Sequence, residues 1–152
     1  MSNRLWISIA LGDALPLRVG NWVDNVVTVQ NLDFGTLVLS GSGAWSGQVI
    51  NMNQAGVLTG CNGKVTCVGT PQAAKYRIVG TNNAIVTITV PRFNLTGPGF
   101  LAFTPNAPAT VNLGSAGSTT GITFGVGGSI SLTSSTPAGV YTGKMLVTAD
   151  YQ

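Results

Sequence analysis

The sequence predicts an all-β sandwich, and three observations support this prediction. Good helix formers are scarce, and no segment repeats apolar residues with the 3.6-residue period of a helix. Short apolar runs recur along the chain, and a turn-forming segment follows each at intervals of about 8–12 residues. Thr, Ser and Asn fill most polar positions, as expected on the solvent faces of strands. The 152 residues are enough for one domain with a substantial core.

The expected strands follow one another from residue 25 to the last residue. They cover 25–41, 46–53, 64–69, 74–81, 84–93, 99–105, 109–115, 128–134 and 143–152. Turn residues such as Gly97-Pro98-Gly99 separate them. In the segment 84–93, Val86, Ile88 and Val90 share one face, which we expect to be buried.

A further apolar strand is expected near the N-terminus, in the stretch RLWISIALG (residues 4–12). Large apolar residues occupy every second position there: Leu5, Ile7, Ile9 and Leu11. This spacing places all four on one face, and their full burial is worth about 6–12 kcal/mol before the entropy of ordering the strand. Pro16 then discourages the chain from staying in a sheet. We therefore divide the chain into a strand and linker (1–20) and a sandwich domain (21–152).

The two cysteines, Cys61 and Cys67, flank Asn62-Gly63, a strong signal for a two-residue hairpin turn. A zinc site would need two more ligands, which a chain without His does not offer, and a redox dithiol normally reads CxxC. Free thiols or a disulfide that closes the hairpin remain. We favour the disulfide, which would stabilise the fold by about 2 kcal/mol and is typical of proteins outside the cytosol.

The composition argues against catalysis. The chain has no His and no Glu, and its four acidic residues are dispersed: Asp13, Asp24, Asp33 and Asp150. General acid–base chemistry and paired carboxylates therefore have few candidates. Asp33 in NLDFG is expected to be a turn residue that bonds its own backbone. We predict that the protein is not an enzyme and holds no metal or other cofactor.

The charge pattern excludes some partners and favours another. The net charge is +3, and the basic residues are scattered, with only Lys75 and Arg77 close together. Nucleic-acid binding needs clustered cations, so we predict no nucleic-acid partner. No run approaches the about 20 apolar residues of a membrane span. Because charged residues make up only 7% of the chain, copies repel one another little, which favours self-association.

The start of the chain is a poor export signal. It has one cation, Asp13 interrupts its apolar run, and no clean small-residue cleavage site follows. We interpret the chain as a mature or engineered form whose export signal has been removed.

Three segments resemble a family of secreted bacterial domains of uncharacterised function, related to the spore-coat-U-like subunits of archaic chaperone–usher pili. They are QNLDFGTL, AKYRIVGTNNAIVTITVP and the ending GGSISLTSSTPAGVYTGKMLVTADYQ, and the resemblance covers about residues 25–152. The ending is the most specific of the three.

The resemblance implies an immunoglobulin-like β-sandwich that lacks its last strand. In such subunits an apolar groove runs along the C-terminal strand, a periplasmic chaperone fills it first, and the N-terminal strand of the next subunit then replaces the chaperone at an outer-membrane usher. Carried over to this chain, Leu5, Ile7, Ile9 and Leu11 would form the donor strand. The groove would be lined by Met145, Val147, Ala149 and Tyr151.

The sequence leaves open where the N-terminal strand binds and what the protein does. The N-terminal strand could fold back and complete its own sandwich instead of entering a neighbouring subunit, because the same apolar face suits either groove. The expected function is a structural subunit of an extracellular, cell-surface filament for attachment or biofilm, exported through the periplasm and built from identical subunits by donor-strand exchange. The alternatives are a secreted glycan-binding module and a self-complemented coat or shell protein.

Overall fold

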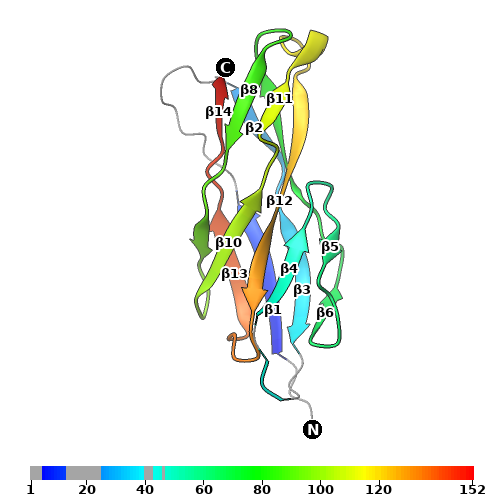
Figure 1. The fold of residues 1–152 in the computed structure, drawn as a ribbon, viewed down its shortest axis with the longest axis vertical. Helices are drawn as coiled ribbons and strands as arrows, with labels where there is room; N and C mark the ends of the chain where they lie inside the picture. The colour runs from blue at the N-terminus through cyan, green and yellow to red at the C-terminus, as the bar shows by residue number, and fades with distance from the viewer. Residues whose placement is uncertain (1–4, 13–24, 40–42, 46) are drawn as a thin grey trace.

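A computed structural model describes residues 5–12, 25–39, 43–45 and 47–152, with only the backbone of residues 5–12 and of Asn25. It confirms the all-β sandwich (Figure 1). The strands are β1 (Leu5–Gly12), β2 (Asn25–Gln30), β3 (Asp33–Leu39), β4 (Gln48–Met52), β5 (Leu58–Thr59), β6 (Val65–Val68), β7 (Ala74–Val79), β8 (Ile85–Thr89), β9 (Phe93–Leu95), β10 (Leu101–Asn106), β11 (Thr110–Asn112), β12 (Ile122–Leu132), β13 (Gly139–Lys144) and β14 (Thr148–Tyr151). A single 3₁₀ turn, Gly114–Ala116, is the one helical element in the described part of the chain.

The strands form three hydrogen-bonded sheets. One has the order β13-β1-β3-β6, and another has the order β11-β8-β14. The third has the order β2-β7-β12-β10-β9, with β4 and β5 added beside β12. The long strand β12 joins the two halves of this sheet, because its first residues pair with β7 and its last ones with β4.

The chain changes sheet where the sequence suggested one continuous strand. The expected strand 25–41 is divided at Asn31 and Leu32, so that β2 pairs with β7 whereas β3 pairs with β1 and β6. Asp33 lies at this corner, where its Oδ1 accepts a hydrogen bond of 2.7 Å from the Gly35 N–H. The predicted local hydrogen bond to the backbone is therefore present, but Asp33 is the first residue of β3 and not a turn residue.

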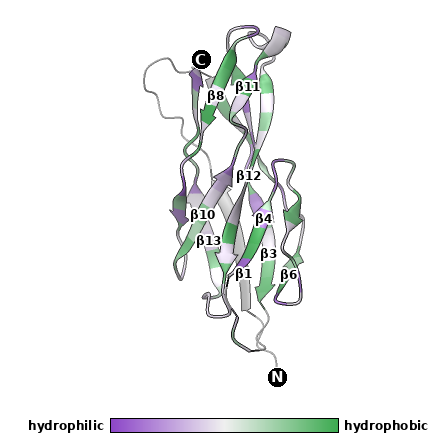
Figure 2. Ribbon diagram, viewed as in Figure 1, coloured by the Kyte–Doolittle hydropathy of each residue, from purple (hydrophilic) through white to green (hydrophobic). Residues whose placement is uncertain are grey.

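One buried cluster joins the sheets. Its largest fully buried members are Phe34, Tyr76, Phe103 and Tyr141. Hydropathy alternates as expected in β8, where Val86 is 0% exposed and its neighbour Ile85 is 43% exposed. Figure 2 shows the apolar stretches of β3 and β8 between more polar loops.

Strand β12 starts at Ile122, six residues before the expected strand. Its glycines suggested a turn, but they lie inside the strand for a packing reason. A Cβ atom at Gly125 would collide with the Gln54 carbonyl oxygen, and one at Gly127 with the Met52 carbonyl oxygen. Glycine therefore lets the segment after β4 cross close to the backbone of β12.

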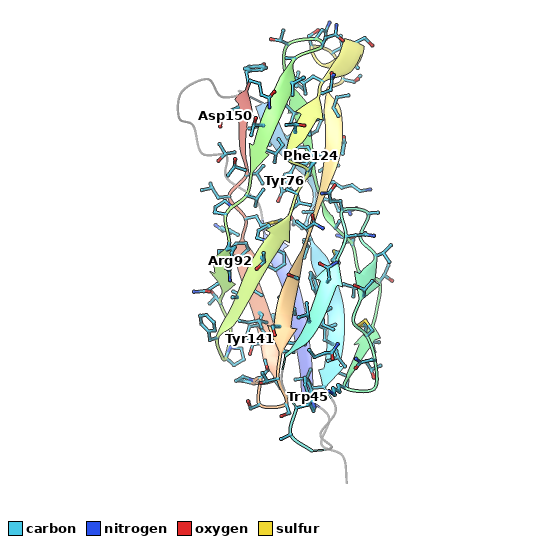
Figure 3. The ribbon with its side chains drawn as sticks, in the orientation of Figure 1. Trp45, Tyr76, Arg92, Phe124, Tyr141 and Asp150 are labelled. Atoms are coloured by element: carbon cyan, nitrogen blue, oxygen red, sulfur yellow. A yellow bond between two sulfur atoms is a disulfide. The ribbon has the colours of Figure 1, made fainter. Side chains whose placement is uncertain are left out.

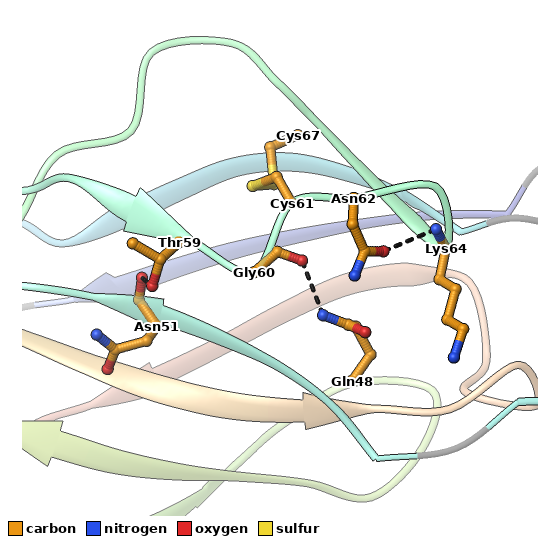
Figure 4. Close-up of a disulfide and its surroundings, with 8 residues drawn as sticks. All are labelled: Gln48, Asn51, Thr59, Gly60, Cys61, Asn62, Lys64 and Cys67. Carbon is orange, nitrogen blue, oxygen red and sulfur yellow. Dashed lines mark hydrogen bonds between the residues drawn. A yellow bond between two sulfur atoms is a disulfide. The ribbon is translucent and has the colours of Figure 1, made fainter.

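The disulfide between Cys61 and Cys67 is present, and it joins the segment after β5 to β6 (Figure 4). The turn is shifted by one residue from the prediction. Asn62 and Val65 exchange backbone hydrogen bonds, so Gly63 and Lys64 are the central residues. The reason is the Asn62 side chain, whose Oδ1 accepts a hydrogen bond of 2.8 Å from the Lys64 N–H.

Replacing both cysteines is expected to weaken the fold moderately. The double variant Cys61→Ser/Cys67→Ser should lose about 2 kcal/mol of unfolding free energy, because the bond closes only a short loop. Urea denaturation of the variant and of the reduced wild type measures the loss, and the two should agree. An unchanged midpoint, together with two alkylatable thiols in the natively produced protein, would refute the bond.

Candidate functional site

Strand β1 fills a slot between two strands that are far apart in the sequence. It pairs in parallel with β13, from Ile7 opposite Gly139 to Gly12 opposite Lys144. It also pairs antiparallel with β3, from Leu5 opposite Leu39 to Ala10 opposite Asp33. Because β1 separates β3 from β13, these two strands are joined only through it (Figure 1). We call the facing edges of β3 and β13 the β1 slot.

The register places the predicted donor positions opposite buried residues. Position 5 pairs with Leu39 and position 7 with Leu37, and both leucines are 0% exposed. Position 9 pairs with Tyr141, which is also 0% exposed. Paired residues on neighbouring strands lie on the same face of a sheet, so these positions belong to the core face. The side chains of Leu5, Ile7, Ile9 and Leu11 themselves lie outside the described atoms.

A bulge in β3 fits the slot to β1. Ile9 pairs with Gly35 and Ala10 with Asp33, so Phe34 is the extra residue on β3. Gly35 has a φ of +74°, and a Cβ atom there would collide with the Val68 carbonyl oxygen of β6. Glycine is therefore required at this point, where β1, β3 and β6 run side by side.

Strand β13 is held firmly on its other edge. Thr96 and Thr142 exchange backbone hydrogen bonds of 2.7 and 2.9 Å. The Tyr141 ring packs against Gly97, where a Cβ atom would overlap it, and its hydroxyl donates a 2.7 Å hydrogen bond to the Pro137 carbonyl oxygen. Burial raises the pKa of the Tyr141 hydroxyl, so it remains a hydrogen-bond donor to a more alkaline pH than an exposed tyrosine. Figure 3 shows Tyr141 in the same half of the molecule as Trp45.

The predicted groove residues lie farther along the chain than the strand that β1 joins. β1 pairs with Gly139–Lys144, not with residues 145–151 as the resemblance implied. The physical reason is a break at residues 145–147, after which β14 joins β8 in another sheet. Met145, Val147 and Ala149 are at most 3% exposed, whereas Tyr151 is half-buried and its hydroxyl accepts a hydrogen bond from the Thr81 N–H.

Sequence reasoning missed the residues that flank β1. These are Leu37 and Leu39 in β3 and Gly139 and Tyr141 in β13. Neither segment alternates cleanly, because Leu37-Val38-Leu39 is a continuous apolar run and Val140 adjoins Tyr141. Hydropathy therefore does not identify the strand that lies beside them. The linker residues 13–20 and the candidates Asp13 and Asp24 lie outside the described residues.

The structure brings no catalytic group together in the described part of the chain. Asp33 lies in β3 and Asp150 in β14, which belong to different sheets. No group of three or more potential metal ligands lies close together among the described residues. Nor does a helix in these ranges have the length and apolar character to cross a membrane.

Comparison with known proteins identifies a family. No curated protein and no solved structure matches the chain. A family profile described as a domain of unknown function, DUF4402, matches residues 25–151, which include every described strand except β1. The chain therefore belongs to the DUF4402 family, with β1 placed before the segment that defines it.

Proposed function

We propose that the protein is a structural subunit of an extracellular filament, assembled when copies exchange β1. The observation that carries the proposal is the β1 slot. Without β1, the facing edges of β3 and β13 have no partner in their sheet, and the covalent connection between β1 and the sandwich is the segment 13–24. The β1 strand of another copy can make the same two ladders, which is the basis of strand exchange between identical chains.

The described form is then the closed state, in which β1 occupies the slot of its own chain. Exchange replaces one set of contacts with an identical set, so it costs little free energy once β1 has left the slot. The contact runs from each copy to the next and does not have to close on itself, which permits a linear polymer. The Cys61–Cys67 bond supports an oxidising, extracytosolic location.

The sequence resemblance adds partners to the proposal. A periplasmic chaperone would hold the β1 slot open before assembly, and an outer-membrane usher would catalyse the exchange. The filament would serve surface attachment or biofilm formation.

The pairing of β1 with its own chain favours a second candidate, a self-complemented secreted protein. In that case β1 stays in place, and the protein works as a monomer or in a coat that other surfaces hold together. In the first candidate β1 pairs with β13 of another copy, and in the second it pairs with β13 of its own chain. Cross-linking between the two strands measures this difference directly.

The double variant Ser8→Cys/Val140→Cys is expected to cross-link between copies in the assembled state. Ser8 and Val140 are paired in register on neighbouring strands, a spacing of about 4.8 Å that a disulfide can span. Exchange predicts a ladder of oligomers on a non-reducing denaturing gel of the native assembly. Oxidation before assembly should instead lock β1 in its own chain and prevent filaments, as seen by negative-stain microscopy.

A matched control is Ser8→Cys/Thr148→Cys, which should not cross-link because β14 lies outside the β1 slot. Filaments in which all Ser8→Cys/Val140→Cys bonds stay within single chains would exclude strand exchange. Locked monomers that still form filaments would do the same.

A further inference from the structure

The strands β2, β7 and β12 carry an exposed row of aliphatic, cationic and hydroxyl side chains on one face. Arg77 in β7 pairs with Val27 on one side and with Thr123 on the other. Arg77 and Thr123 are exposed, and Val27 is 43% exposed. Residues paired across neighbouring strands project to the same side, so an aliphatic group, a guanidinium and a hydroxyl lie next to one another.

A second cation extends this row along β7. Lys75 is exposed on the same face as Arg77, two residues away, which places the two cations about 7 Å apart along the strand. Its partners are Gln30 and Gly125, and Val29, 54% exposed, lies nearby on β2. We call Val27, Val29, Lys75, Arg77 and Thr123 the β2–β7–β12 face.

No described carboxylate neutralises these cations. The described acidic side chains are Asp33 and Asp150, which lie in β3 and β14, in other sheets. Two like charges on neighbouring positions of one face repel each other, so the fold itself gains nothing from their proximity. Among the described residues, this arrangement leaves two cations available to an anionic partner.

We propose that the β2–β7–β12 face binds an acidic polysaccharide, a chain of sugars that bear carboxylates. Arg77 can hold a carboxylate with two parallel hydrogen bonds, and Lys75 supplies a second positive charge along the same line. Thr123 can bond a sugar hydroxyl, and the valines can cover the apolar C–H groups of a sugar ring. The face reaches the edge of its sheet at β2, so an extended polymer can lie across it.

Other anionic partners fit this face less well. Membrane-binding surfaces insert large apolar side chains such as Trp, Phe or Leu, whereas the exposed apolar residues here are valines. Nucleic-acid binding requires several clustered cations, and this face has two. The face belongs to a different sheet from β1, so the proposal does not depend on strand exchange. In a filament the face would repeat, and weak single contacts would add up through multivalency.

Electrophoresis of the full chain through a gel that contains polygalacturonate tests the proposal. The wild type should be retarded relative to a gel with neutral dextran, and about 0.5 M NaCl should remove the effect by screening. The double variant Lys75→Gln/Arg77→Gln should lose most of the retardation, at up to about fivefold in affinity for each exposed cation.

The control variant Lys64→Gln/Arg92→Gln removes the same charge from two other exposed positions and should bind like the wild type. Val27→Glu should also weaken binding, because it places a carboxylate beside Arg77, whereas Val49→Glu, at a residue 51% exposed on β4, should not. All four variants change exposed side chains, and an unchanged melting temperature shows that each is folded.

Three results would overturn the proposal. Wild-type protein that is not retarded has no such site, and equal losses in the two double variants would show only a response to net charge. Stronger binding to phosphatidylglycerol vesicles than to polygalacturonate, with the same sensitivity to Lys75→Gln/Arg77→Gln, would assign the face to a membrane instead.

Discussion

A chain that lacks residues 1–12 is expected to lose its cooperative thermal unfolding transition. The deletion removes β1 and leaves the facing edges of β3 and β13 without partners. The four apolar residues of β1 account for about 6–12 kcal/mol if fully buried, which is comparable to the whole stability of a typical domain, about 5–15 kcal/mol. Circular dichroism during heating measures the transition.

The same truncated chain provides a test of whether the slot accepts a separate strand. A synthetic peptide of residues 4–12 should restore the transition when added in excess, because binding to the folded form stabilises it by mass action. A peptide with Ile7→Ser and Ile9→Ser should fail, and a chain that lacks only residues 1–3 should melt like the full chain. A truncated chain that melts like the full chain without peptide would show that β1 is dispensable for the fold.

The variant Val147→Asp is expected to abolish folding, whereas Thr148→Asp should cost less than about 1 kcal/mol. Val147 is 0% exposed among core residues, and a buried carboxylate without a partner costs several kcal/mol. Thr148 is half-buried, and it lies on the other face of the same segment, where it pairs with Thr89 of β8. The yield of folded protein and the urea midpoint measure the difference.

The variant Val147→Thr is the matched control, since it keeps the shape of the side chain and replaces one methyl group by a hydroxyl. It should fold with an intermediate loss of stability. Equal yields for Val147→Asp and Thr148→Asp would contradict the register of the C-terminal segment.

Composition and the regular spacing of apolar runs and turns were sufficient to predict the fold class, and alternation of apolar residues predicted the faces of single strands. In β8 it correctly separates the buried Val86 and Ile88 from the exposed Ile85. It also correctly predicts that Val147 is buried. Each of these predictions depends on one strand and its own period, which the sequence displays directly.

The neighbours of each strand could not be predicted in the same way. Alternation does not reveal that the chain leaves one sheet at Asn31 and Leu32, or that it breaks between β13 and β14. Both events decide which residues flank β1, and these residues precede the predicted groove positions along the chain. The turn at Gly63 and Lys64 was displaced because one side-chain hydrogen bond from Asn62 decides its position.

The pairing of β1 along both of its edges has a mechanical consequence. A load applied at Gly12 along the strand axis acts in shear, because the ladders to β3 and β13 both run parallel to the pull. All of the hydrogen bonds then resist together, whereas a strand at a sheet edge can be peeled away one bond at a time. Resistance of this kind is governed by the rate of rupture, so tension along β1 would be borne for a long time even where the equilibrium stability is modest.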